Sequence, residues 1–144
     1  MKFSLLVLFS IISLMTSSQT LEKHRWENRI LLVISEENNS NEEYSNQLQV
    51  INDSFEGYTE RKLIVYTVLP DKYRLLDITT NQEANWIKNS KLYSTYNKNK
   101  KPFKVVLIGL DGSVKEERNA AINSEELFAI IDGMPMRRSE LNRK

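Results

Sequence analysis

Four basic side chains of this sequence could together hold an anion. Arg61 precedes an apolar run, Lys115 follows an Asp-Gly pair, and Arg137 and Arg138 stand side by side near the end of the chain. A guanidinium group presents its N–H donors as a rigid fork, which suits carboxylate and phosphate groups. If folding brings the four onto one concave surface, the sequence predicts an anion-binding protein, or an enzyme of unrecognised chemistry with a carboxylate as acid or base.

The stretch around the paired arginines also has a structural explanation. An apolar helical pattern reaches Ile131, and Gly133 and Pro135 then interrupt it. The paired arginines would lie near the carbonyl end of that helix, where cations are favoured, and could pair with Asp132 or Glu60. We favour this explanation because the polar groups at helix ends need partners in any fold. A third use of the stretch is a partner surface, for which Met134 and Met136 supply flexible apolar side chains.

Thiol chemistry is excluded by composition, because the chain has no cysteine. It can be neither a thiol peroxidase nor a disulfide oxidoreductase. His24 is the one histidine, and it has no acidic, Ser or Cys partner pattern that would indicate a catalytic dyad. We expect it to be exposed near the N-terminus. The sequence therefore predicts no catalytic residue, no metal ligand set and no cofactor.

The stretch 36–43, "EENNSNEE", is rich in oxygen atoms that could bind Ca²⁺. It lacks the alternating Asp/Asn spacing and the glycine of a calcium-binding loop. A solvated loop that caps a helix is the simpler interpretation, and a calcium-responsive module is the alternative.

The first 18 residues read as a signal peptide. Lys2 is followed by an apolar run and then by Thr16, Ser17 and Ser18. The run is shorter than the about 20 residues that span a bilayer, so we predict cleavage after Ser18 and no stable membrane anchor afterwards; an uncleaved anchor is the alternative. The exported protein would be periplasmic or secreted.

Residues 19–144 have the length of a single domain with its own core. Once Lys2 is removed, 19 basic residues balance 19 acidic residues. This balance argues against a nucleic-acid-binding protein, which needs a basic surface. Another envelope or extracellular protein is the expected partner.

Hydrophobic patterns indicate the elements that must position these residues. The runs Arg29–Glu36 and Leu63–Leu69 are continuously apolar, as in strands covered on both faces. Between them an apolar stripe from Tyr44 to Tyr58 predicts a helix that ends at Gly57. Residues 71–82 are polar and show no period. Ala84–Tyr96 is the next predicted helix, with Trp86, Tyr93 and Tyr96 as its candidate buried residues.

The second half begins with Pro102, which we interpret as an ordinary proline before a strand, with a cis bond as the alternative. Asp111-Gly112 then predicts a tight turn that pairs Val105–Gly109 with Ser113–Arg118. Asn123 and Ser124 are good caps for a final helix. The order is that of a thioredoxin-like α/β fold, βαβ-α-ββα, with a four-stranded mixed sheet in the order 2-1-3-4 and strand three antiparallel to strand one.

The segments "NRILLVI", "ERKLIVYTV", "VVLIGLDGSVK" and "LFAIIDGMPMRRSEL" resemble a bacterial domain family of unknown function. The same domain occurs at the C-terminus of animal sushi-repeat and related extracellular-matrix proteins. The resemblance runs from about Leu21 to Leu141 and implies a peroxiredoxin-like version of the thioredoxin fold in an exported setting, with no known reaction. The matching positions that we expect to be structural are Arg29, Glu60, Asp111, Gly112, Asp132, Met134, Pro135 and Met136.

Overall fold

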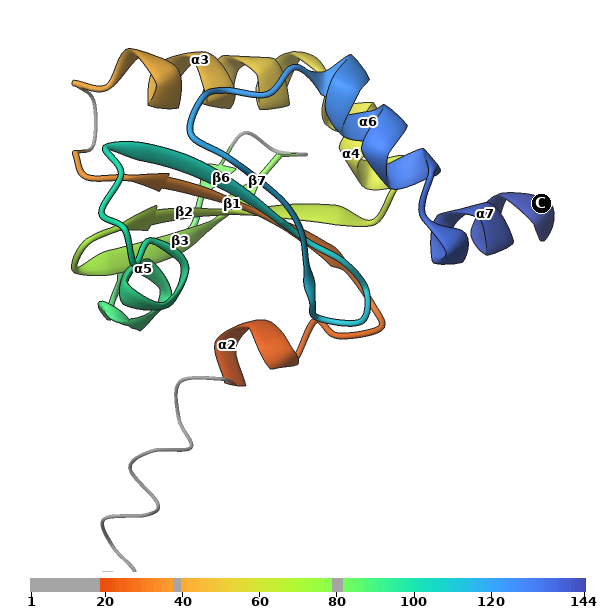
Figure 1. Cartoon of the computed structure of the whole chain (residues 1–144), viewed down its shortest axis with the longest axis horizontal. Coiled ribbons are helices and arrows are strands. Elements are labelled where there is room, and N and C mark those ends of the chain that lie inside the picture. Colours follow the sequence, from red (N-terminus) through yellow and green to blue (C-terminus); the bar gives the residue numbers. More distant parts are fainter. Residues whose placement is uncertain (1–18, 38–39, 79–81) are drawn as a thin grey trace, which may run out of the picture.

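A computed structural model describes residues 19–37, 40–78 and 82–144. In chain order its elements are α2 (Gln19–Glu22), β1 (Arg29–Ser35), α3 (Glu42–Asp53), α4 (Phe55–Glu60), β2 (Leu63–Leu69), β3 (Lys72–Asp77), β4 (Gln82–Glu83), β5 (Ile87–Lys88), α5 (Lys91–Tyr96), β6 (Phe103–Ile108), β7 (Val114–Arg118), α6 (Ser124–Asp132) and α7 (Pro135–Asn142). Figure 1 shows α3, α4 and α6 on one face of the sheet, and α2 and α5 on the other.

The sheet has seven strands in the described part of the chain. Six follow the order β4-β3-β2-β1-β6-β7, and β5 pairs with β3. β1 is parallel to β2 and antiparallel to β6, with Ile30 opposite Ile108. The thioredoxin-like class and the order of the four central strands are therefore as the sequence predicts, whereas the predicted number of strands is wrong.

The strands that were not predicted, β3, β4 and β5, lie where the sequence predicted a polar stretch and a long helix. β3 forms a hairpin with β2, and most of its side chains are only half-buried. Such a strand shows no continuous apolar run, which is why its sequence gives no strand pattern. The predicted helix is reduced to α5. Trp86 precedes it in extended chain and stacks on strand β3, with its ring 4.1 Å from Cζ of Arg74 and 4.9 Å from Nζ of Lys72.

Each face of the central strands belongs to its own core, because successive residues of a strand point to opposite sides. Leu31 and Val33 of β1 pack under α3, α4 and α6, and Leu32 and Ile34 pack on the α5 side. The helical segment predicted from Tyr44 to Tyr58 exists but breaks at Ser54 into α3 and α4. Gly57 lies inside α4 rather than ending the helix, and a Cβ there would collide with the ring of Phe128.

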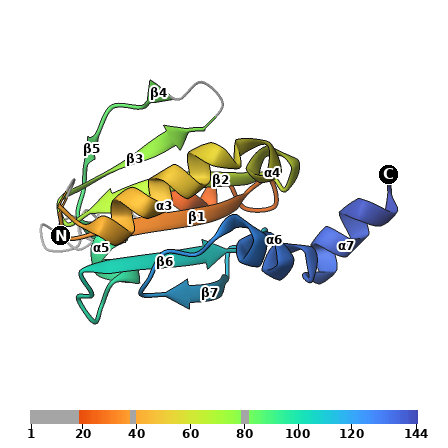
Figure 2. The same cartoon turned by 90° about the horizontal axis from the view of Figure 1, so that it is seen from above.

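The predicted hairpin forms between β6 and β7. Gly112 has a φ of 81°, a conformation that glycine adopts at no steric cost, and the N–H of Gly109 donates to the carbonyl of Ser113 at 2.9 Å. The last helix begins as predicted, since the Asn123 side chain accepts from the N–H of Glu126 at 2.8 Å. It ends at Asp132, and Pro135 opens α7. In Figure 2, α7 lies beyond the end of the sheet.

Candidate functional site

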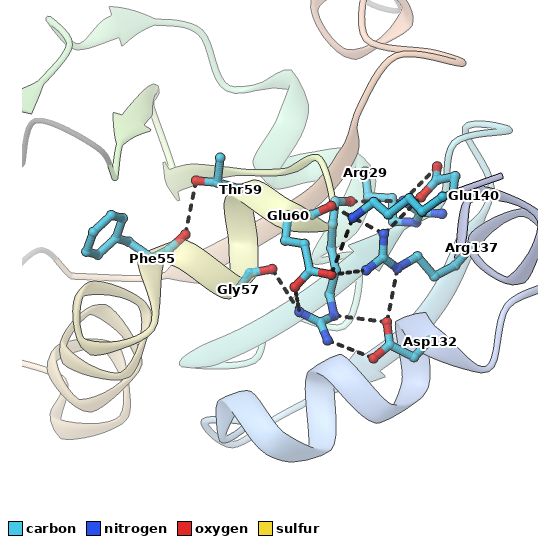
Figure 3. A network of polar contacts seen from close by, with 10 residues as sticks. Arg29, Phe55, Gly57, Thr59, Glu60, Asp132, Arg137 and Glu140 are labelled. Carbon is cyan, nitrogen blue, oxygen red and sulfur yellow. Dashed lines mark hydrogen bonds and ion pairs between the residues drawn. The ribbon is translucent and has the colours of Figure 1, made fainter. Parts of the chain in front are cut away.

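Arg137 is the centre of an ionic network that fixes α7 to the rest of the domain. Its side chain is 2% exposed. Its Nε donates to Asp132 Oδ1 at 3.1 Å and its Nη2 donates to Glu60 Oε1 at 2.8 Å. Its Nη1 is 3.3 Å from both the Glu60 carbonyl and Glu140 Oε2. One side chain of α7 thus connects the ends of α4 and α6, as Figure 3 shows.

Arg61 holds Asp132 from the other side. Its Nε donates to Oδ1 at 3.0 Å and its Nη2 donates to Oδ2 at 2.7 Å, which is the two-point geometry that an arginine forms with a carboxylate. Its Nη1 donates to the carbonyl of Gly57 at 3.1 Å, and its Cζ lies 4.2 Å from the centroid of the Phe128 ring. Arg61 therefore ties α4 to α6 by charge and by stacking.

Arg29, the first residue of β1, completes the network and is 1% exposed. Its Nη1 donates to the Arg61 carbonyl at 2.9 Å and lies 3.3 Å from Glu140 Oε2. We call the six residues Arg29, Glu60, Arg61, Asp132, Arg137 and Glu140 the clasp. Its three arginines balance its three carboxylates, so the clasp is neutral and its charges are mostly used within the protein.

The clasp changes the acidity of its own groups. Hydrogen bonding from Arg61, helped by Arg137 and opposed by burial, lowers the pKa of Asp132 below its ordinary value. Burial would lower the pKa of the Arg137 guanidinium, but its hydrogen bonds to Asp132, Glu60 and Glu140 outweigh this effect and raise the pKa. At neutral pH Asp132 and Arg137 are therefore both charged.

The four residues predicted to converge on an anion do not form one surface. Arg61 and Arg137 meet at Asp132, which is a carboxylate of the protein itself. Lys115 lies on the hairpin, where its Nζ is 3.0 Å from Asp111 Oδ2. Arg138 is exposed on α7 and forms no ion pair with any residue that the structure describes.

The residues on either side of the hairpin turn and of the α6–α7 turn line a partly open cavity of about 260 Å³. Asp111 and Lys115 lie on the hairpin side and Met134, Pro135 and Met136 on the helix side, with Arg29, Gly109 and Leu110 completing the wall. Gly112 sits just outside it, next to Arg25. The hydrogen bonds of Ser113 and Lys115 lower the pKa of Asp111 to about 2. We call this space the hairpin cavity.

At the opposite end of β1 the acidic stretch is divided between loop and helix. Glu36 and Glu37 are exposed, residues 38–39 lie outside the described part of the chain, and Glu42 and Glu43 begin α3. Asn41 caps α3 by accepting from the N–H of Tyr44 at 3.2 Å. No group of three acidic or histidine side chains suited to a metal ion occurs among the residues described.

Pro102 lies beside this loop. Its carbonyl accepts from the N–H of Glu36 at 3.1 Å and from the Asn41 side chain at 3.3 Å. Its peptide bond is trans, like all others in the described ranges. The proline thus joins the loop to the start of β6.

His24 is not the exposed residue that the sequence predicted. It is half-buried, and its Nε2 lies 2.8 Å from the hydroxyl of Tyr66 on β2. Burial, with a contribution from Lys23, lowers the pKa of the imidazole. Thr20 forms a similar contact with Tyr73, at 3.3 Å. These contacts dock the N-terminal segment on the sheet. No local sequence pattern predicts them, because the partners are more than 40 residues apart.

The arrangement is that of a thioredoxin-like protein. Reduced 2-Cys peroxiredoxin from Plasmodium vivax is similar with a TM-score of 0.53 and 11% identity, covering 84% of this chain and 84% of that one. Plasmodium yoelii thioredoxin peroxidase I gives a TM-score of 0.53 and 11% identity, covering 83% of this chain and 79% of that one. Identity at this level establishes the fold alone.

The sequence matches DUF4174, a domain of unknown function, over residues 20–140, and the chain belongs to that family. No curated protein matches it significantly. Among the described residues no helix is long and apolar enough to cross a membrane.

Proposed function

We propose that this chain is an exported, non-redox binding module, and that its partner is another protein of the envelope or the extracellular space. The observation that carries the proposal is the end of β1 at Ser35. In thioredoxin-like enzymes the reactive thiol lies just after this strand, at the start of the next helix. Here that position has exposed carboxylates and the cap residue Asn41, and the chain has no cysteine. The fold is kept without the chemistry, and binding is the activity that it can still supply.

Residues 1–18 support export, because their basic start, apolar run and small residues match a signal peptide. The single domain 19–144 would then be periplasmic or secreted, with Gln19 as its first residue and without a stable anchor. We also propose that the family is bacterial and shares this domain with animal sushi-repeat and related matrix proteins, on the strength of the four sequence segments given above.

The exposed side chains of α7 form the surface that we assign to the partner. Met136 and Leu141 are each 41% exposed, and Arg138 is also exposed. Methionine and arginine are enriched at protein interfaces. The buried Arg137 holds the helix in place from its inner side, so the face is presented rigidly and binding need not order it first. A partner with apolar and acidic side chains fits this face.

An enzyme that uses Arg61, Lys115, Arg137 and Arg138 together is not favoured by this geometry. Asp132, Glu60 and Glu140 already occupy the two arginines of that set that are buried or half-buried. Within the clasp, the unused hydrogen-bonding capacity belongs to Arg29, which is outside the predicted set.

The test is affinity capture from the envelope fraction of the cells that make the protein. Three forms of residues 19–144 are compared: wild type, the double variant Met136→Glu with Arg138→Glu, and Glu37→Lys at the opposite end of the molecule. We expect wild type and Glu37→Lys to retain the same partner and the double variant to lose it. Equal retention by all three would contradict the assigned surface. Peroxide or disulfide turnover by the purified domain would contradict the non-redox role.

A further inference from the structure

One edge of a buried arginine has no partner among the residues that the structure describes. The Nε and Nη2 atoms of Arg29 are shielded from solvent and form no hydrogen bond with any described residue, whereas its Nη1 is fully used. Nε and Nη2 form the side of the guanidinium group that grips a carboxylate at two points. A buried charged donor without a hydrogen-bond partner destabilises the folded protein. An acceptor that binds this edge of Arg29 would remove that cost.

The same protein shows how such an edge is used. The Nε and Nη2 atoms of Arg61 hold both oxygens of Asp132. Those of Arg137 hold one oxygen each of Asp132 and Glu60. Of the three clasp arginines, Arg29 alone lacks a carboxylate on this edge. It is also the one that lines the hairpin cavity.

From these observations we infer that the hairpin cavity binds a small carboxylate with an apolar chain, and that the Nε–Nη2 edge of Arg29 grips its carboxylate. The inference rests on the proposed function, since it gives the binding module a ligand class. Met136 belongs both to the wall of this cavity and to the exposed surface of α7, whereas the other residues of the two sites differ.

The wall of the cavity defines the rest of the ligand. Leu110, Met134, Pro135 and Met136 make most of it apolar, which suits an alkyl chain. Lys115 is a second cation at the wall, but it already pairs with Asp111. A doubly charged phosphate would face the carboxylate of Asp111, so a singly charged carboxylate fits better. The volume of about 260 Å³ equals the share of about nine water molecules at about 30 Å³ each. An eight-carbon chain is of this size.

Two sequence segments singled out for their family resemblance meet at this cavity. "VVLIGLDGSVK" supplies Gly109, Leu110, Asp111 and Lys115, and "LFAIIDGMPMRRSEL" supplies the two methionines and the proline. The clasp explains Arg137 of the second segment, but it uses neither the hairpin nor the methionines. A shared cavity gives both segments a purpose.

Access to the Arg29 edge requires the wall to move, because neither nitrogen reaches the solvent. Met134 and Met136 suit this role. Methionine is unbranched and has three rotatable side-chain bonds, so it can repack around an inserted chain at little cost.

The experiment measures binding of octanoate to residues 19–144 by calorimetry. Octanamide tests whether the ligand needs a charge, and octylamine tests whether that charge must be negative. Acetate tests whether the alkyl chain is needed. We expect binding of octanoate alone, and at least an about tenfold weaker affinity for the variant Arg29→Met, which keeps the bulk and removes the donors. The matched control Arg143→Met removes the same charge at an exposed position outside the cavity and should bind as wild type does.

A second variant guards against a folding defect in Arg29→Met. Met136→Trp keeps every charge and fills the cavity from an exposed position, and it should also abolish binding. The Nε–H resonance of Arg29 in the wild-type protein should shift on addition of octanoate. If octanoate does not bind wild type, or binds both cavity variants as tightly as wild type, the inference is overturned. If octanoate does not bind while the protein partner is still captured through α7, the ligand class is wrong and the proposed function stands.

Discussion

The two ends of strand β1 have very different polar surroundings. After Ser35 the chain enters an open loop, where Glu36 and Glu37 are exposed and Asn41 makes a simple helix cap. At Arg29 the chain enters the clasp, whose three arginines are buried or half-buried among three carboxylates. The thioredoxin-like fold is known for chemistry at the first end. In this protein the costly polar arrangement lies at the second end.

A member of a fold class that lacks the expected reactive residues can carry its function at the other end of the same strand. At the Ser35 end the charged side chains of Glu36 and Glu37 are exposed to water, so little is lost if they change. The Arg29 end has buried charges, which persist in a fold only when partners compensate them. The cavity beside Arg29 and the rigid α7 both depend on that compensation.

The largest effect should come from removing the centre of the clasp. Arg137→Ala leaves Asp132, Glu60 and Glu140 with fewer cations, and we expect it to cost about 3 kcal/mol, near the low end for a broken buried pair because these carboxylates are partly exposed. Arg138→Ala should change stability by less than about 0.5 kcal/mol. Urea unfolding of both variants measures the difference. Similar small losses would mean that the clasp does not hold the C-terminal helix.

A smaller effect is expected from acid. Because the pKa of Asp132 is lower in the folded than in the unfolded protein, the folded state binds fewer protons. Its contribution to stability is complete above the unfolded value of about 3.9 and is lost as the pH falls through the folded value. Wild type should therefore lose more stability between pH 5 and acid conditions than Asp132→Asn.

Asp111, whose pKa is about 2, is present in both proteins and cancels in this comparison. Unfolding curves at a series of pH values provide the measurement. Parallel pH profiles of the two proteins would show that Asp132 is not ion-paired in solution.

The smallest effect belongs to the Ser35 end. Asn41→Ala removes the hydrogen bond to the N–H of Tyr44 and should cost about 1 kcal/mol, the usual value for a helix cap. Asn46→Ala, at an exposed position of α3, removes the same amide without a cap and should leave stability unchanged or slightly raised. Thermal unfolding distinguishes them. A loss for Asn41→Ala as large as that for Arg137→Ala would remove the contrast between the two ends.

The sequence predicted those parts of the fold that local patterns encode. Two continuous apolar runs gave β1 and β2, and Asp111-Gly112 gave the hairpin. Strand β3 was missed because its side chains are half-exposed and its pairing with β2 depends on a turn at Pro70 that has no glycine.

The candidate site was predictable only in part. The adjacent arginines and Asp132 lie close together in the sequence, so their pairing could be weighed in advance. The role of Arg29 could not be predicted, because its partner Glu140 is 111 residues away in the sequence. One clue was present: a single charged residue begins a strand that is otherwise fully apolar up to its last residue, and such a charge needs buried partners.

That separation of 111 residues also affects the order of folding. While the chain is being made, the sheet partners of β1 emerge before α7 does. Arg29 therefore spends most of synthesis without the carboxylate of Glu140. Closure of the clasp is a late, long-range step, and contacts of this kind slow folding. Chains that lack α7 should accumulate as partly folded species. Their unclosed clasp makes them targets for proteases and chaperones.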